Sequence, residues 1–350
     1  MKSVARMALT PGMTLGEDIL WQGNVLFSAG TMLSQNDIDK MKRYSIMIVT
    51  IMEDVDFATT HYEKLRYSQD FKLFEQKHAM NLMNYKQHMH NFVTFGKPIP
   101  DHVLLDIYND LHTTSNNGSE LLDYLYNLMP NEDELTFNHS LNSALLAGAF
   151  AEWIEMPEED KKDLILSGFY YDIGKLKLPY EVLWSSEKLS EEQFNVIKKH
   201  TAVGWAMLGN ANLPSRVLEA VLMHHERMDG TGYPHHAKGD EINLFARYIA
   251  IVDTYIAMAS PRPHRDALTP LQILGHFESD IAKYDAEILV PLMKRIANAQ
   301  IGTNVILSDD TVWEVFIINT NRYSRPTLRN DRQQILDLIE HPELAIVKMV

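Results

Sequence analysis

Cysteine is absent from the 350 residues of the sequence. This absence excludes a disulfide framework and a thiolate metal site, and it favours a reducing compartment. Histidine, aspartate and glutamate are then the side chains left to bind a metal, and 15 histidines are available.

Long apolar runs are also missing. No stretch approaches the ~18 apolar residues of a membrane span, and the first residues, MKSVARMALTPG, contain no apolar signal core. These two absences predict a cytoplasmic protein that does not enter a membrane.

Basic residues are in deficit, because 32 Lys and Arg against 47 Asp and Glu give a net charge of −15. A field of this sign repels nucleic acid polymers and anionic lipids. An anionic ligand would therefore have to meet a local basic patch.

Length and pattern predict a mainly α protein of two structural units, because one core usually serves at most roughly 250–300 residues. Short apolar pieces broken by turn residues indicate a small strand-rich accessory unit over residues 1–56. Residues 57–130 are interpreted as connecting helices with a candidate homodimer surface. Residues 131–300 carry successive helical patterns, and residues 301–350 return to strand and turn. We expect the two strand-rich ends to pack together as one accessory unit, since each is too small for a core of its own.

The helical middle segment repeatedly places a histidine or an aspartate beside an apolar stripe. These residues are His139, Asp172, His200, His224, His225 and Asp253. A single histidine at a helix end is most often an ordinary hydrogen-bonded residue. Burying several imidazoles together with two carboxylates is unfavourable by several kcal/mol unless a divalent cation neutralises the carboxylates and uses the imidazole lone pairs.

The chemistry of this set indicates a metal site. Nitrogen and oxygen ligands suit Fe, Mn, Ni or Zn. A carboxylate shared by two metals about 3.5–4 Å apart could hold a water with a lowered pKa that attacks a phosphodiester.

The stretch HHERMDGTGYP, residues 224–234, predicts a rigid loop after a helix end. Gly230 and Gly232 are expected at turns with positive φ, and Pro234 is expected to hold Tyr233 extended. The motif DGTGYP alone could be an ordinary turn. Preceded by HHE, it resembles the HD-GYP branch of the HD hydrolase superfamily, with a match from residue 139 to about residue 270.

This resemblance implies a helical metal phosphodiesterase that hydrolyses the bacterial messenger cyclic di-GMP to the linear dinucleotide and GMP. One divalent metal, with Fe or Mn favoured and Ni or Zn as alternatives, would bind His200, His224, His225 and Asp172. A second would share Asp172 with His139 and Asp253. Further roles carried over from the family are catalysis by Asp172 with Lys175, substrate phosphate contacts from Lys175, Arg262 and Arg265, and a ligand contact from Tyr233.

Three positions depart from the family pattern. Tyr171 replaces the histidine of the HD pair in GFYYDIGKLKLP and removes a ligand from the second metal, unless its phenolate coordinates a hard metal. The alternative is a packed aromatic with a hydrogen-bonded hydroxyl. Ile256 stands where many relatives carry an aspartate. Leu135 stands where members with three metals carry a glutamate, and Glu134 is off by one, so a third metal is not expected.

These departures leave three hypotheses. The chain is a cyclic di-GMP phosphodiesterase of reduced activity, or an impaired module that binds metal and cyclic di-GMP and signals to partners such as diguanylate cyclases. The third hypothesis, an HD hydrolase of another phosphoester, is disfavoured by the DGTGYP motif. Since a binder and an enzyme both need Lys175 and Tyr233, the sequence does not separate the first two.

Overall fold

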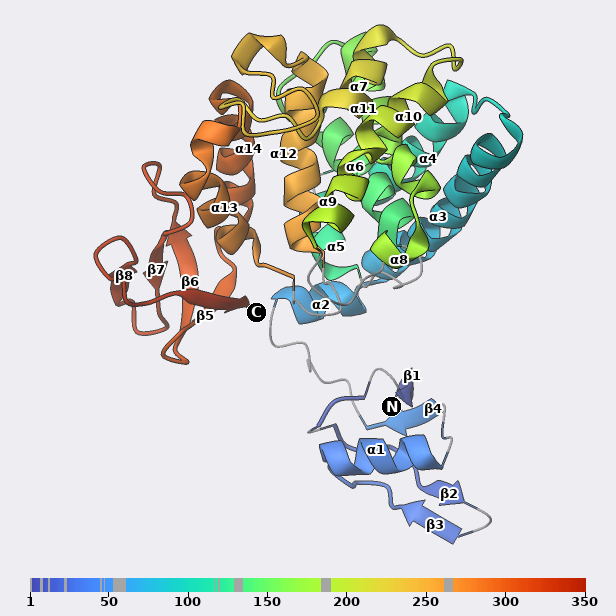
Figure 1. Ribbon diagram of the computed structural model, residues 1–350. Helices are drawn as coiled ribbons and strands as arrows, with labels where there is room; N and C mark the ends of the chain where they lie inside the picture. The colour runs from blue at the N-terminus through green and yellow to red at the C-terminus, as the bar shows by residue number, and fades with distance from the viewer. Residues whose placement is uncertain are drawn as a thin grey trace. The chain divides into compact units, whose positions relative to one another are not determined.

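The computed structural model describes residues 2–6, 9–11, 13–21, 24–44, 46, 48–52, 61–116, 118, 120–128, 135–183, 190–260 and 267–350. The chain divides into two compact units, Met1–Thr59 and Thr60–Val350. Figure 1 shows the elements of each unit.

The first unit combines four short strands with one helix. β1 (Lys2–Ala5) pairs antiparallel with β4 (Ile48–Ile51), and β2 (Ile19–Trp21) pairs antiparallel with β3 (Asn24–Phe27). α1 (Gln35–Arg43) begins after Ser34, whose side chain accepts from the Asp37 amide in a capping box. The unit has its own apolar core, formed by Leu9, Met13, Leu15, Phe27, Leu33, Met41, Val49 and Ile51.

The second unit is mainly helical, as the sequence predicts. Its first helices are α2 (His61–Tyr67), α3 (Gln69–Phe95), α4 (Asp101–Thr114), α5 (Leu121–Asn127), α6 (Leu135–Trp153) and α7 (Glu158–Tyr170). They are followed by η3 (Ile173–Lys177), α8 (Tyr180–Leu183), α9 (Glu191–Lys198), α10 (His200–Leu208), α11 (Ser215–Met223) and η4 (Gly239–Glu241). The last are α12 (Leu244–Ala259), α13 (Pro270–Ser279), η5 (Ile281–Lys283) and α14 (Ala286–Ala299). None of the helices among the described residues is long and apolar enough to cross a membrane.

Small residues let the central helices of this unit approach closely. α6 is buried on every side from Leu141 to Ala151, and α7 packs on it through Gly168. A Cβ at Gly168 would lie 2.6 Å from the Ala144 Cα, closer than carbon atoms can pack. α3 covers the same core with buried side chains at helical spacing, among them Phe71, Phe74 and His78.

A five-stranded antiparallel sheet closes the chain, in the order β8-β7-β6-β5-β9. Its strands are β5 (Asn304–Leu307), β6 (Val312–Ile317), β7 (Thr327–Arg329), β8 (Ile335–Asp337) and β9 (Ile346–Met349). Figure 1 shows α13 and α14 between α12 and these strands. The Gln272 side chain of α13 donates to the Ile346 carbonyl, and buried Val305 and Leu328 belong to the same core as the helices.

Among the described residues, the strands of the two ends form separate sheets. The expected packing of residues 301–350 on residues 1–56 stays a prediction.

Candidate metal centre

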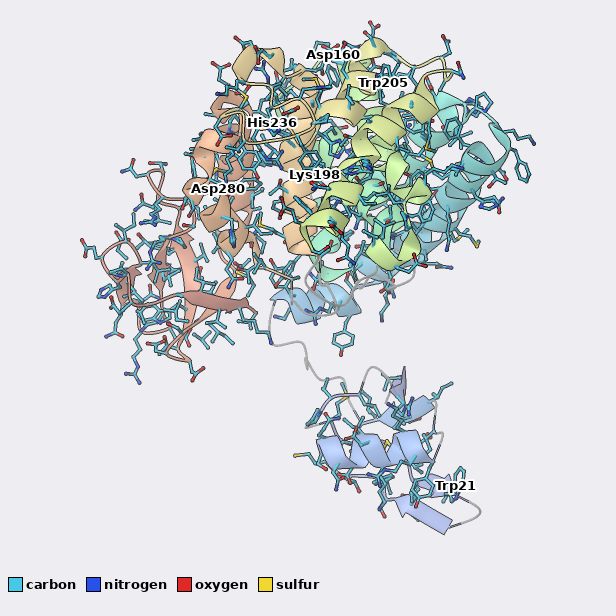
Figure 2. The ribbon with its side chains drawn as sticks, viewed as in Figure 1. Trp21, Asp160, Lys198, Trp205, His236 and Asp280 are labelled. Carbon is cyan, nitrogen blue, oxygen red and sulfur yellow. The ribbon has the colours of Figure 1, made fainter. Side chains whose placement is uncertain are left out.

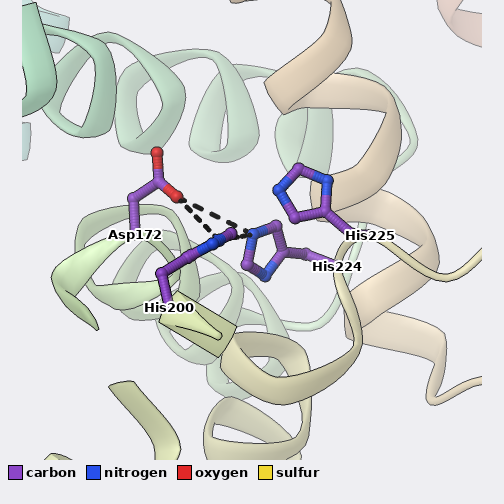
Figure 3. A group of neighbouring side chains, drawn as sticks. All are labelled: Asp172, His200, His224 and His225. Atoms are coloured by element: carbon purple, nitrogen blue, oxygen red, sulfur yellow. Dashed lines mark hydrogen bonds and ion pairs between the residues drawn. The ribbon is translucent and has the colours of Figure 1, made fainter. Parts of the chain in front are cut away.

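Helix ends bring the ligands of the first cluster together. Asp172 lies in the turn between α7 and η3, His200 is the first residue of α10, and His224 and His225 directly follow α11. Figure 3 shows their side chains converging. A glycine makes this convergence possible, because a Cβ at Gly174 would lie 1.9 Å from the His200 carbonyl oxygen.

Backbone carbonyls fix the orientation of two of the imidazoles. The Nδ1 of His200 lies 2.6 Å from the Ile197 oxygen, and the Nδ1 of His224 lies 2.9 Å from the Val221 oxygen. A carbonyl oxygen can only accept, so each Nδ1 carries the proton and each Nε2 of a neutral ring presents a lone pair. Metal-binding histidines are typically oriented in this way.

Three acceptor atoms then face one another with no proton between them. The two Nε2 atoms of His200 and His224 are 3.2 Å apart, and they lie 3.3 Å and 3.8 Å from the Asp172 Oδ1. This Oδ1 is buried and accepts no hydrogen bond. Buried acceptors without donors are unfavourable, and a cation at their focus removes the penalty. The residues therefore fit a divalent metal, with His225 as the fourth member of the group.

Burial keeps these imidazoles neutral, as metal binding requires. It lowers the pKa of His224 to about 3, and it holds the pKa values of His200 and His225 below the ordinary value. Burial would raise the pKa of Asp172, but the ammonium of Lys175 outweighs it and the pKa is lowered. The cluster thus presents neutral rings and an ionised carboxylate.

The second cluster comprises His139, Asp172 and Asp253. His139 lies on α6, one turn inside the helix rather than at its start, and Asp253 lies on α12. The His139 Nε2 is 2.8 Å from the Asp253 Oδ1. This pair already satisfies itself by a hydrogen bond, in contrast to the converging acceptors of the first cluster.

Tyr171 lies between the two clusters and is fully buried. Its hydroxyl donates to the Asp253 Oδ1 over 3.2 Å and is 3.1 Å from the Ser143 Oγ. Its ring meets His224 edge-on at 4.9 Å. Burial and the charges of Asp253 and Asp172 raise the pKa of Tyr171 well above its ordinary value. The structure shows Tyr171 as a packed aromatic with a hydrogen-bonded hydroxyl, and coordination of a metal by its phenolate stays a prediction.

The predicted substrate-binding residues are partly within the described structure. The Lys175 Nζ lies 2.6 Å from the Asp172 Oδ2, the oxygen that does not face the imidazoles. The Tyr233 ring stacks on His225 at 4.7 Å and 27°. Arg262 and Arg265 lie outside the described residues.

A residue that the sequence analysis did not assign holds the loop after α11. Glu226 is buried, and its carboxylate accepts from the amides of His235 and Ala237. The sequence feature that could have identified Glu226 is its position directly after the paired histidines. The expectation of positive φ is confirmed for Gly230, with φ of 79°, and is wrong for Gly232. Gly232 is required for space instead, because a Cβ there would lie 2.4 Å from the Glu226 Cα.

The structure also locates the other two positions that depart from the family pattern. Ile256 is buried in the core on α12 and offers no ligand atom. Leu135 begins α6, whereas Glu134 lies outside the described residues.

Known proteins match this region of the chain. Residues 123–288 match a family model described as an HD domain. A cyclic di-GMP phosphodiesterase of Pseudomonas aeruginosa is 31% identical over 176 residues, which are 50% of this chain and 42% of that protein. A cyclic di-GMP phosphodiesterase of Thermotoga maritima is 32% identical over 178 residues, 50% of this chain and 48% of that protein.

A third relative is named for a related substrate. The 3′3′-cGAMP-specific phosphodiesterase 1 of Vibrio cholerae is 33% identical over 156 residues, 45% of this chain and 36% of that protein. The chain spans less than half the length of each of these three relatives.

Proposed function

We propose that the chain, whose residues 123–288 match a family model described as an HD domain, is a metal-dependent phosphodiesterase that hydrolyses cyclic di-GMP to the linear dinucleotide and GMP. The observation that carries the proposal is the focus of three proton-free acceptors, the Nε2 atoms of His200 and His224 and the Oδ1 of Asp172. Such a focus needs a cation, and the ligand types suit Fe, Mn, Ni or Zn, of which the family resemblance favours Fe or Mn.

The residues around that cation have different roles in binding the metal and the substrate. When bound, a divalent metal lowers the pKa of a water and neutralises charge on phosphoryl oxygens. Asp172 would be a ligand of the metal, and its Oδ2 also pairs with Lys175 at 2.6 Å, so the ammonium is positioned beside the cluster. There it can bind a substrate phosphate oxygen. Tyr233, stacked on His225, offers a ring against the ligand.

The choice of cyclic di-GMP comes from the DGTGYP motif and from relatives named for that substrate. The relative named for 3′3′-cGAMP makes this second cyclic dinucleotide a necessary comparison in any assay. We also propose a cytoplasmic location, since a chain without cysteine fits a reducing compartment.

One observation favours a second candidate function. The Tyr171 hydroxyl donates to Asp253, and His139 bonds the same oxygen, so the second cluster is short of one ligand and partly satisfied without a metal. Loss of even an indirect contact to a ligand typically weakens metal binding or activity about 10- to 100-fold. The second metal is therefore the weaker one, and activity is reduced. In the limit, the chain is a module that binds metal and cyclic di-GMP and signals to partners such as diguanylate cyclases.

Turnover and metal content of the purified chain test the proposal. The protein is loaded anaerobically with Fe²⁺ or Mn²⁺, and conversion of cyclic di-GMP is followed by chromatography with 3′3′-cGAMP in parallel. We expect slow conversion that Asp172→Asn abolishes together with bound metal. Asp309→Asn is the matched control, since Asp309 is an exposed residue in the turn between β5 and β6. Binding of cyclic di-GMP without conversion would replace the enzyme by the signalling module, and absence of both would reject the two candidates.

A further inference from the structure

Two side chains on α9 lie next to the ring of Tyr233, which itself stacks on His225 of the first metal cluster. We propose that Phe194 and Lys198, together with Tyr233, form a recognition shelf that binds one purine base and one phosphate of the cyclic dinucleotide. This proposal rests on the proposed function and adds to it the residues that select the substrate.

The shelf is a continuous series of ring and cation contacts. The Lys198 Nζ lies 4.7 Å from the centroid of the Phe194 ring and 5.9 Å from that of Tyr233. The rings of Phe194 and Tyr233 meet edge-on at 6.4 Å. Since Tyr233 stacks on His225, the shelf begins at the first metal cluster and runs to the end of α9, where Figure 2 labels Lys198.

The charge on this shelf has no carboxylate partner among the residues that the structure describes. The Lys198 ammonium donates only to the side-chain amide oxygen of Asn195, over 3.1 Å. Lys77, Lys161 and Lys162, in contrast, each form an ion pair with a carboxylate. An ammonium held over two aromatic rings without one is suited to an anion that arrives with the ligand.

The aromatic part of the shelf is open to a ligand. The Phe194 side chain is 43% exposed although it is a large apolar group on a polar helix. Exposed aromatic rings beside a cation are the usual platform for a nucleobase and its phosphate, because every base has a π face that can stack. A cyclic dinucleotide carries two purines and two phosphates, so one phosphate can occupy the metal cluster while the remaining groups reach the shelf.

Binding and turnover measurements on the metal-loaded full chain test this proposal. The variants are Lys198→Ala and Phe194→Leu, and the matched control is Lys199→Ala, because Lys199 is the adjacent lysine, is exposed, and contacts neither ring. The probe is the non-hydrolysable bisphosphorothioate analogue of cyclic di-GMP, measured by calorimetry. We expect Lys198→Ala to weaken binding about tenfold and Phe194→Leu roughly threefold, with metal content unchanged.

Steady-state kinetics separate recognition from chemistry. KM for cyclic di-GMP should rise in the two shelf variants and stay unchanged in Lys199→Ala, with little change in kcat. Binding of both shelf variants within twofold of Lys199→Ala would overturn the shelf and leave the proposed function intact. If the wild type binds the analogue and hydrolyses nothing, the proposed function fails while the shelf is still judged by the binding data. A wild type that does not bind the analogue overturns the shelf as well.

Discussion

At the scale of residues, Tyr171 determines how many ligand atoms the second cluster can offer to a metal. A histidine at this position would offer a lone pair to a second metal, whereas the hydroxyl of the buried tyrosine donates a hydrogen bond to Asp253. The lone pair of a histidine would attract a metal ion, whereas the hydrogen of a hydroxyl group repels it. The first cluster does not depend on this residue for a ligand atom, so the two metal sites are expected to differ in affinity.

Tyr171→His should raise metal content from about one to about two ions per chain and raise turnover at least about tenfold. The imidazole would replace the protonated hydroxyl by a lone pair directed at the second cluster. Metal analysis by mass spectrometry and the cyclic di-GMP assay give the two readouts. Tyr171→Phe is the control, because it keeps the ring and removes only the hydroxyl. Loss of metal in Tyr171→Phe would instead show that the hydroxyl is itself a ligand.

His78 provides a pH dependence that is separate from the metal ligands. It is buried between α3 and α6, where its Nε2 lies 2.7 Å from the Asn142 Oδ1, and burial lowers its pKa to about 4. The unfolded chain binds this proton at a pKa of about 6.5. The stabilising contribution is therefore complete above pH 6.5 and is lost as the pH falls toward 4.

Between pH 7 and pH 5, the wild type should lose about 2 kcal/mol more of its free energy of unfolding than His78→Gln loses. Urea titrations of both proteins, stripped of metal with a chelator, measure this difference. The other buried histidines are common to both proteins, so their effects cancel in the comparison. Equal losses would mean that His78 is hydrated or protonated in the folded state.

At the scale of elements, the crossing of η3 over α10 sets the distance between Asp172 and His200. Gly174 and Gly204 meet at this crossing, where a Cβ at Gly204 would lie 3.1 Å from the Gly174 amide nitrogen. Any side chain at Gly174 must push the two elements apart. The close approach therefore couples the packing of these elements to the geometry of the metal cluster.

Gly174→Ala should destabilise the chain by more than about 2 kcal/mol and lower its metal content, because the added methyl would overlap the His200 carbonyl. Gly209→Ala is the matched control at the end of α10. There the nearest atom to a new Cβ is 3.5 Å away, an ordinary contact, so a change within about 0.5 kcal/mol is expected. Thermal melts and metal analysis measure both effects. Equal behaviour of the two variants would contradict a tight crossing.

The elements themselves were the part of the fold that the sequence predicted best. α7, α11 and α12 lie within residues 131–300, where the sequence predicts successive helices, since apolar periodicity is a local pattern. The partner of the Tyr171 hydroxyl could not be found in this way, because Asp253 is 82 residues away in the sequence. The prediction of a positive φ at Gly232 was wrong for the same reason. A neighbouring chain segment, and not the φ of Gly232 itself, requires a glycine there.

At the scale of the whole molecule, the chain has two separate principal cores. The apolar residues of β1–β4 and α1 form one, and the helices share the other with the C-terminal sheet. The core of the second unit combines the helices and the C-terminal strands in one apolar cluster. None of the described residues of this cluster comes from the first unit. This argues that the second unit, residues 60–350, is stable by itself.

Deleting residues 1–59 should therefore leave a folded chain with unchanged metal content and a melting temperature within about 2 °C of the corresponding transition in the full chain. For a unit of this size, about 1 kcal/mol of lost stability lowers the melting temperature by roughly 2–4 °C. A larger fall would mean that the first unit stabilises the second, as packing of residues 301–350 on residues 1–56 would require. Calorimetry of the metal-loaded proteins decides between these outcomes, because a stabilising interface lowers the transition on deletion and two independent cores do not.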